Sequence, residues 1–157
     1  MSVYTDVMDL QGFKRKSRSW YRDQVRALLD PLDGMPAFGD VVFYSYQAEH
    51  ADKLKFWDKY PMTLITDIDV SQNRFEGGNL HYLRPTTRVS VGKSIKAGAI
   101  SYPRRCYHKY LISNASGFYK VPREELEDIG KLPLEQFVST VMGRSIDIPS
   151  SFVWSRL

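Results

Sequence analysis

Residues 56–85 read FWDKYPMTLITDIDVSQNRFEGGNLHYLRP, and the fold depends mainly on this stretch. It contains two apolar runs, 62–68 and 80–83, separated by a linker over 69–79 that is rich in turn-forming residues. The first run mixes branched apolar residues with threonine and aspartate, a composition typical of a half-buried strand. The linker contains asparagines and paired glycines, which tolerate positive φ. This favours a hairpin or a bulge between two strands.

Upstream of this stretch, residues 41–46 read VVFYSY and form the clearest predicted strand of the chain. A polar link over 47–55 connects this strand to the next one. Three strands joined by turns predict a small, strongly bent antiparallel sheet of the SH3-like barrel type. With flanking helices, the predicted class is α+β, and a chain of 157 residues is most simply one domain.

Flanking helices are predicted before and after these strands in the chain. Ser17 or Ser19 can cap a helix over 20–29, where apolar residues follow helical spacing. Pro103 suits the first turn of a helix over 104–113, and a further helix is expected over 134–142. Residues 88–96 are a weaker helix candidate, because valine, glycine and serine are poor helix formers.

The two ends of the chain differ from the predicted globular domain, residues 17–147. Residues 1–16 have weak periodicity and end in a basic run, so we expect a flexible basic arm that a partner could order. The tail, 148–157, is too apolar for a free terminus and should dock on the domain or on a neighbour. We therefore expect both end segments to make contacts between molecules.

Composition narrows the class of protein. The hydrophobic content of 43% and the charged content of 25% are those of a folded soluble protein. No apolar run approaches the roughly 20 residues that a membrane helix needs, and the N-terminus lacks the apolar region of a secretory signal. The single cysteine excludes an internal disulfide and makes structural zinc improbable. We expect a cytosolic protein, or one inside an assembly built in a cytosol, with no cofactor.

Charge is distributed unevenly along the chain, although the net charge is only +4. Between Glu76 and Glu124 there is no acidic residue, while nine cationic residues fall there: Arg84, Arg88, Lys93, Lys96, Arg104, Arg105, Lys109, Lys120 and Arg123. A second basic cluster near the start consists of Lys14, Arg15, Lys16, Arg18, Arg22 and Arg26. Such asymmetry predicts a polyanion or an acidic protein surface as partner. The alternative is a basic face that is merely solvated.

No catalytic arrangement is favoured by the titratable residues. Cys106 and His108 lie two residues apart, so on a helix they would not share a face. His81 suits a packed imidazole better than a base or a metal ligand. Asp67 and Asp69 would share one strand face, but they are better interpreted as surface acids that lead into a turn. The sequence therefore predicts no catalytic residue and no metal site.

Several motifs occur in a constant order over residues 38–157. They are Phe43-Tyr44-Ser45-Tyr46, Trp57-Asp58-Lys59-Tyr60-Pro61, Gly78-Asn79-Leu80-His81-Tyr82-Leu83, Cys106-Tyr107-His108-Lys109-Tyr110-Leu111, Pro122-Arg123-Glu124-Glu125, Leu132-Pro133-Leu134-Glu135-Gln136-Phe137 and Val153-Trp154. This order resembles a family of small proteins of tailed phages, especially T-even-like myophages, that are called DNA end protector proteins. The resemblance implies a non-enzymatic virion protein, assembled in the host cytoplasm.

The resemblance also implies partners. These would be other virion proteins in a symmetric assembly, with DNA as a candidate and no membrane. The alternative is a structural component of the neck, tail or baseplate that bridges neighbouring subunits. A nuclease is the least favoured class. Asn79, His81 and Tyr82 of the most specific motif are predicted to be structural.

The residues predicted to bind nucleic acid come from the two basic clusters. They are Lys14, Arg15, Lys16, Arg84, Arg88, Arg104, Arg105 and Lys109. If the protein grips DNA, the last five should converge on one face. Helical spacing would align Arg105 with Lys109, which lie four residues apart.

Overall fold

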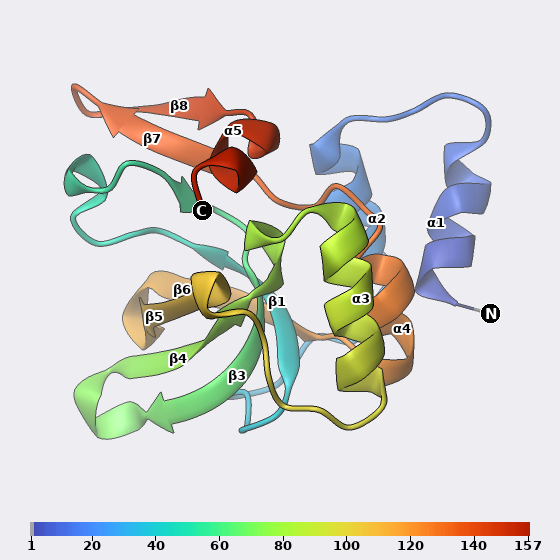
Figure 1. Ribbon diagram of the computed structural model, residues 1–157, viewed down its shortest axis with the longest axis horizontal. Helices are drawn as coiled ribbons and strands as arrows, with labels where there is room; N and C mark the ends of the chain where they lie inside the picture. The colour runs from blue at the N-terminus through green and yellow to red at the C-terminus, as the bar shows by residue number, and fades with distance from the viewer. Residues whose placement is uncertain (1) are drawn as a thin grey trace.

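The computed structural model describes residues 2–157 and centres on a five-stranded antiparallel sheet in the order β5-β4-β3-β1-β6 (Figure 1). Its strands are β1 (Val41–Tyr46), β3 (Met62–Asp69), β4 (Arg74–Asn79), β5 (Tyr107–Leu111) and β6 (Ala115–Lys120). The two edge strands, β5 and β6, are consecutive in the chain and joined by the 3₁₀ turn η5 (Ile112–Asn114). The predicted α+β class with an antiparallel sheet is confirmed. No ladder joins β5 to β6 in residues 2–157, so the sheet is not a closed barrel.

The side chains of β1 alternate between two cores, because successive residues of a strand point to opposite faces. Val42 and Tyr44 enter an aromatic cluster inside the bent sheet, where Tyr44 lies 5.6 Å from Phe75 and 5.7 Å from Tyr110 between ring centroids. Val41 and Phe43 enter the larger core beneath the helices. Both faces of this strand are therefore buried, which explains its continuous apolar sequence.

Five helices pack around the larger core. They are α1 (Val3–Gln11), α2 (Arg18–Leu28), α3 (Pro85–Lys96), α4 (Arg123–Ile129) and α5 (Ser150–Ser155). Figure 1 shows α1 to α4 gathered on one side of the sheet, with α3 beside α4. Each helix buries at least one apolar side chain in the common core, for example Val7 of α1, Val25 of α2 and Val153 of α5. No helix in residues 2–157 is long and apolar enough to cross a membrane.

A second, three-stranded sheet consists of β2 (Trp57–Asp58), β7 (Phe137–Val141) and β8 (Arg144–Ile148), with the 3₁₀ turn η1 (Ala51–Lys53) against β7. Met142 and Gly143 connect β7 to β8 with φ of 52° and 77°, the positive φ pair that a two-residue hairpin turn needs. The helix predicted over 134–142 is wrong. The β-branched sequence FVSTV suits a strand, and Phe137 and Val138 are buried.

The strand expected over 80–83 lies earlier in the chain than the sequence predicts. Strand β4 occupies most of the predicted linker, the turn η2 (Val70–Gln72) leads into it, and Leu80–Tyr82 form the 3₁₀ turn η3. Two glycines make this strand possible. A Cβ on Gly77 would lie 2.1 Å from the carbonyl oxygen of Leu64, and a Cβ on Gly78 would lie 2.3 Å from the ring of Tyr102. The glycines therefore serve close backbone approach rather than a turn.

Two helix predictions in the basic half need revision. The helix predicted over 104–113 is wrong, because residues 104–106 form the 3₁₀ turn η4 (Arg104–Cys106) and residues 107–111 form β5, which pairs with β4. Helix α3 is well formed despite its poor helix formers. Pro85 occupies its first turn, and Gly92 allows α4 to approach, since a Cβ there would meet Glu127 Cα at 3.3 Å. Packing has overridden propensity here.

Most of the predicted N-terminal arm is a helix that packs on the domain. Met1 lies outside the described residues, but residues 3–11 form α1, capped by Ser2. Val7 is fully buried, and the backbone N–H of Val3 donates to Glu125 at 3.0 Å. The apolar tail docks on its own domain through α5, where Trp154 Nε1 donates to the carbonyl oxygen of His81 at 2.9 Å.

Candidate nucleic-acid interface

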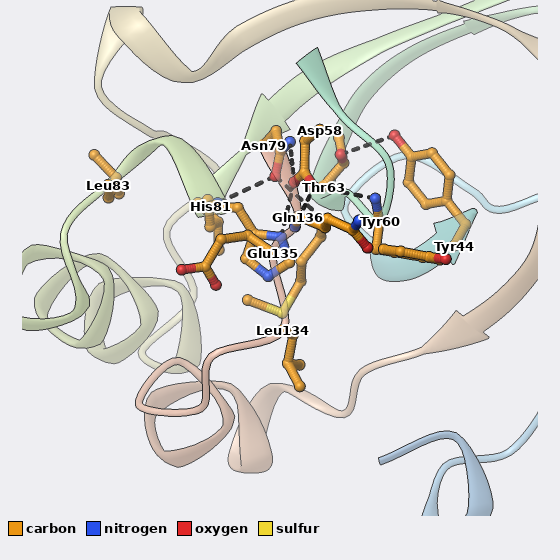
Figure 2. Close-up of polar contacts among 12 residues, drawn as sticks. Tyr44, Asp58, Tyr60, Thr63, Asn79, His81, Leu83, Leu134, Glu135 and Gln136 are labelled. Atoms are coloured by element: carbon orange, nitrogen blue, oxygen red, sulfur yellow. Dashed lines mark hydrogen bonds and ion pairs between the residues drawn. The ribbon is translucent and has the colours of Figure 1, made fainter. Parts of the chain in front are cut away.

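A buried carboxylate, Asp58, connects the two sheets (Figure 2). Its Oδ2 accepts from Asn79 Nδ2 at 3.0 Å and lies 2.9 Å from His81 Nδ1. Its Oδ1 accepts from the backbone N–H groups of Tyr60 and Gln136 at 3.0 and 3.1 Å. All four lone-pair directions of the carboxylate are thus used, which holds β2, β4 and the segment before β7 together.

Asp58 remains an anion despite its burial. Burial alone would raise the pKa of the carboxyl, but the adjacent His81 charge and the hydrogen bonds from His81, Asn79 and Tyr60 outweigh it. The pKa of Asp58 therefore lies below its ordinary value. With the carboxylate ionised, His81 Nδ1 is the donor of their shared hydrogen bond.

Asn79, His81 and Tyr82 lie within this buried region. Asn79 Oδ1 accepts from the backbone N–H groups of Met62 and His81 at 3.2 and 3.1 Å, which satisfies donors at the start of β3 and η3. The ring of Tyr82 stacks on His108 at 4.3 Å between centroids. None of the three motif side chains is exposed, so in this conformation none can contact a large ligand.

Arg88 has to be removed from the predicted DNA-contacting set, because it is only 1% exposed. Its guanidinium donates to four backbone carbonyl oxygens, those of Leu80, Leu83, Gly130 and Leu132. Its Nη2 also lies 3.8 Å from Glu135 Oε1. Burial lowers the pKa of Arg88, and the nearby Glu135 carboxylate partly offsets this. Arg88 therefore joins α3 to the segment after α4 instead of facing solvent.

Sequence reasoning missed two of the buried groups in this region, Asp58 and Glu135. Glu135 Oε1 pairs with Arg18 Nη1 at 2.9 Å. The same carboxylate is therefore shared between Arg18 at the surface and the buried Arg88. Both acids lie within motifs of apolar and aromatic residues, and this position could have predicted their burial. A buried carboxylate needs a hydrogen-bond or charge partner.

Residues 77–123 contain no acidic residue, but several of their lysines pair with carboxylates from other segments of the chain. Lys93 and Lys96 lie 3.6 and 4.0 Å from Glu127, and Lys120 lies 3.3 Å from Asp40. Carboxylates of distant segments therefore pair with these lysines, and Lys93 and Lys96 share one of them. The solvated-face alternative fits these lysines.

Lys109 is one of the neutralised cations and does not align with Arg105. It lies on β5 rather than on a helix, and its Nζ is 3.7 Å from Glu76 Oε1 on the adjacent strand. The helical spacing that was expected to bring Lys109 and Arg105 together is thus absent.

Three arginines of the basic half remain exposed without an ion pair among the described residues: Arg84, Arg104 and Arg105. Arg84 follows η3, and Arg104 and Arg105 form part of η4, which packs against η3. The guanidinium of Arg84 lies 6.0 Å from the Trp154 ring of α5. We call Arg84, Arg104 and Arg105 the η3–η4 arginines.

The other predicted cluster, Lys14, Arg15 and Lys16, lies on the exposed loop between α1 and α2. In Figure 1 this loop is far from η4, which lies in the yellow segment beside β5. Among residues 2–157, none of these three cations makes an ion pair. Lys14, Arg15 and Lys16 thus lie apart from the five residues that were expected to converge, and of those five Arg88 is buried and Lys109 pairs with Glu76. No group of three or more His, Cys, Asp or Glu side chains in these residues could hold a metal ion.

Comparison with known proteins identifies the family. A family model described as phage T4 terminal DNA protecting protein matches residues 5–98. The match includes Lys14, Arg15 and Lys16, the buried Asp58–His81 pair and Arg84, whereas Arg104 and Arg105 lie beyond it. No curated protein and no solved structure matches the chain. Because the family model covers more than half of the chain, the protein belongs to the family of the phage T4 terminal DNA protecting protein.

Proposed function

We propose that this protein is a non-enzymatic phage virion protein that binds the ends of phage DNA and protects them. Family membership indicates that the target is the end of a DNA molecule. The exposed cations of the protein could bind the phosphates of that DNA. The observation that carries the proposal furthest is the set of η3–η4 arginines. They remain exposed and free of carboxylates among the described residues, while Lys93, Lys96 and Lys120 each lie within 4.0 Å of a carboxylate.

Guanidinium groups suit this role. Each can donate two parallel hydrogen bonds to phosphate oxygens, which a lysine ammonium cannot do. Contacts to phosphates carry no sequence information, so one protein could hold any DNA terminus. Such binding weakens steeply with added salt, because each phosphate contact releases condensed counterions.

The buried groups support a non-enzymatic role. Asp58 and His81 form a pair of the kind that activates nucleophiles in hydrolases, but both side chains are only 1% exposed. A phosphodiester could not reach His81 in this conformation. Burial also raises the pKa of Cys106 to about 12, so its thiol stays protonated and weakly nucleophilic at neutral pH.

Charge reversal tests the η3–η4 arginines as the DNA surface. In the double variant Arg104→Glu and Arg105→Glu, the slope of log K against log salt should flatten by about 0.9 for each phosphate that the variant no longer binds. The matched control is Lys93→Glu with Lys96→Glu, which changes the net charge equally at cations already paired with Glu127. If both variants change the slope equally, the η3–η4 arginines are not the DNA-contacting surface.

A second candidate function has one observation in its favour. The tip of the β7–β8 hairpin exposes Met142 at 98%, Val141 at 48% and Ile146 at 47%. An apolar projection of this kind suits a contact with another virion protein in a symmetric assembly. If the wild-type protein binds no DNA even at low salt, this structural role replaces DNA protection.

We also propose that the five-stranded sheet is a variant of the SH3-like barrel. The strand order, the 3₁₀ turn between the two edge strands and the aromatic cluster inside the bend support this assignment. An experimental structure should show β5 and β6 facing each other across that cluster. Edge strands that diverge would refute it.

A further inference from the structure

The loop between α1 and α2 combines an exposed aromatic residue with three consecutive cations. Gly12 ends α1 with φ of 67°, and Phe13, Lys14, Arg15 and Lys16 follow. Phe13 is 112% exposed, so its ring makes almost no contact with the rest of the protein. A single exposed aromatic needs no explanation by itself. Here, however, three cations follow Phe13 directly, and an exposed ring beside cations is a combination that suits binding to nucleic acid.

Both ends of the loop are anchored. The Tyr21 hydroxyl donates to Gln11 Oε1 at the end of α1 and accepts from the backbone N–H of Lys16 at 3.3 Å. Ser17 then caps α2 by accepting from the backbone N–H of Trp20 at 3.2 Å. The stretch between these anchors is short, so the ring of Phe13 is presented from a defined place on the surface.

A groove of about 350 Å³ lies against this loop. Its lining includes three aromatic residues, Tyr4, Phe13 and Tyr21, and two cations, Arg15 and Lys131. No carboxylate lines it, although Lys131 Nζ lies 2.8 Å from Asp128 Oδ1. Its volume is near the lower end of small-ligand sites, roughly 300–1,000 Å³, which suits a single nucleotide.

Three grooves are larger than this one, and two of them contain carboxylates. The groove of about 730 Å³ is lined by the cations of Lys120 and Arg123 and by five carboxylates, those of Asp6, Asp30, Asp40, Glu124 and Glu125. The groove of about 550 Å³ is lined by two cations, Arg18 and Arg22, and two carboxylates, Glu135 and Asp147. Carboxylates repel phosphate, so these two grooves suit a nucleotide less well. The groove of about 470 Å³ also has cations and no carboxylate, but its Phe152 is only 42% exposed, whereas Phe13 is 112% exposed and free to stack on a base.

We propose that this groove binds the terminal nucleotide of a DNA duplex. Phe13 stacks on the exposed face of the end base, and Arg15 contacts the last phosphates. This inference rests on the proposed function and deepens it. Only a duplex end presents an unstacked base face, since every internal base is covered on both sides. Stacking on Phe13 therefore distinguishes an end from the interior, which phosphate contacts alone cannot do.

The test compares two DNA probes of the same sequence. One is a short blunt duplex with 2-aminopurine as its terminal base, and the other is a dumbbell whose two ends are closed by hairpin loops. The wild-type protein should bind the blunt duplex more tightly and should quench the terminal 2-aminopurine. Phe13→Ala should weaken binding to the blunt duplex about 5- to 150-fold, leave binding to the dumbbell unchanged and remove the quenching. Because Phe13 is fully exposed, this variant should fold normally.

The matched control is Phe38→Ala, which removes a 63% exposed phenylalanine from another loop and should change neither affinity nor quenching. Equal affinity of the wild-type protein for both probes would overturn the inference and leave general DNA binding intact. Loss of quenching in Phe38→Ala as well would also overturn it. If neither probe binds, the proposed function fails together with the inference, and the groove becomes a site for an acidic protein segment.

Discussion

Replacing Arg88 with methionine should remove a buried support of the fold without touching the DNA surface. The guanidinium is 1% exposed and donates from Nε, Nη1 and Nη2. Its acceptors lie at 3.0 to 3.4 Å and are the carbonyl oxygens of Leu80, Leu83, Gly130 and Leu132. Methionine fills much of the same volume but donates no hydrogen bond.

The expected loss is about 3–5 kcal/mol in the free energy of unfolding. The carbonyl oxygens of Leu80 and Leu132 also accept from backbone N–H groups, so they keep a partner. The cost therefore falls mainly on Leu83 and Gly130, at roughly 1–3 kcal/mol for each buried carbonyl that is left unpaired. Glu135 in addition loses one of its two cations while it stays buried.

Urea unfolding followed by circular dichroism measures this loss. The midpoint should fall while the slope m stays unchanged, because the surface exposed on unfolding is the same. The control on the same helix is Lys93→Met, at an exposed cation whose pair with Glu127 should be worth less than about 1 kcal/mol. A loss below about 1 kcal/mol for Arg88→Met would refute the reasoning.

Two further predictions concern the buried carboxylate and the glycine strand. The ¹³C signal of the Asp58 carboxyl should titrate below its unfolded pKa of about 3.9. Because the folded-state pKa of Asp58 is depressed, the stability that this carboxylate contributes is present above about pH 4. It is lost as the pH falls through the folded-state pKa. A titration midpoint above about 4 would contradict this prediction. Gly77→Ala should cost about 1–3 kcal/mol or more in thermal unfolding, because its Cβ would lie 2.1 Å from a backbone oxygen of Leu64. Gly92→Ala, whose Cβ would meet Glu127 at 3.3 Å, should cost clearly less.

Elements with a strong local signal could be predicted from the sequence. Helix α2 begins at its serine cap, where Ser17 accepts from Trp20 N, and its apolar residues follow helical spacing. Strands β1 and β3 lie where branched and aromatic residues cluster. In these segments, propensity, pattern and burial all favour the same structure.

Elements that depend on distant partners could not be predicted. Strand β4 contains Gly77 and Gly78, which are poor strand formers, and it exists because β3, β5 and Tyr102 pack closely against it. Its neighbour β5 follows Pro103, which locally favours a helix start. In both segments the tertiary environment decided between a turn, a helix and a strand.

The candidate interface was predictable only as a set of charges. Arg84 and Arg88 are four residues apart and look equivalent in the sequence, yet one is exposed and the other is buried against carbonyl oxygens. Lys109 is neutralised by Glu76, which precedes it by more than thirty residues in the chain. Which cations remain free depends on long-range interactions that a linear charge pattern does not contain.

Residues from three motifs of the family resemblance contact one another, and these contacts link the buried Asp58 to the exposed Arg84. Asp58 holds His81 through Nδ1, and the carbonyl oxygen of His81 accepts from Trp154 Nε1 at 2.9 Å. Trp154 in turn lies under Arg84, with 6.0 Å between the guanidinium and the ring. A change at Asp58 should therefore reach Arg84 through His81 and Trp154, although Asp58 itself is too deeply buried to contact DNA. Asp58, His81, Trp154 and Arg84 thus form one continuous series of contacts from a buried carboxylate to the surface.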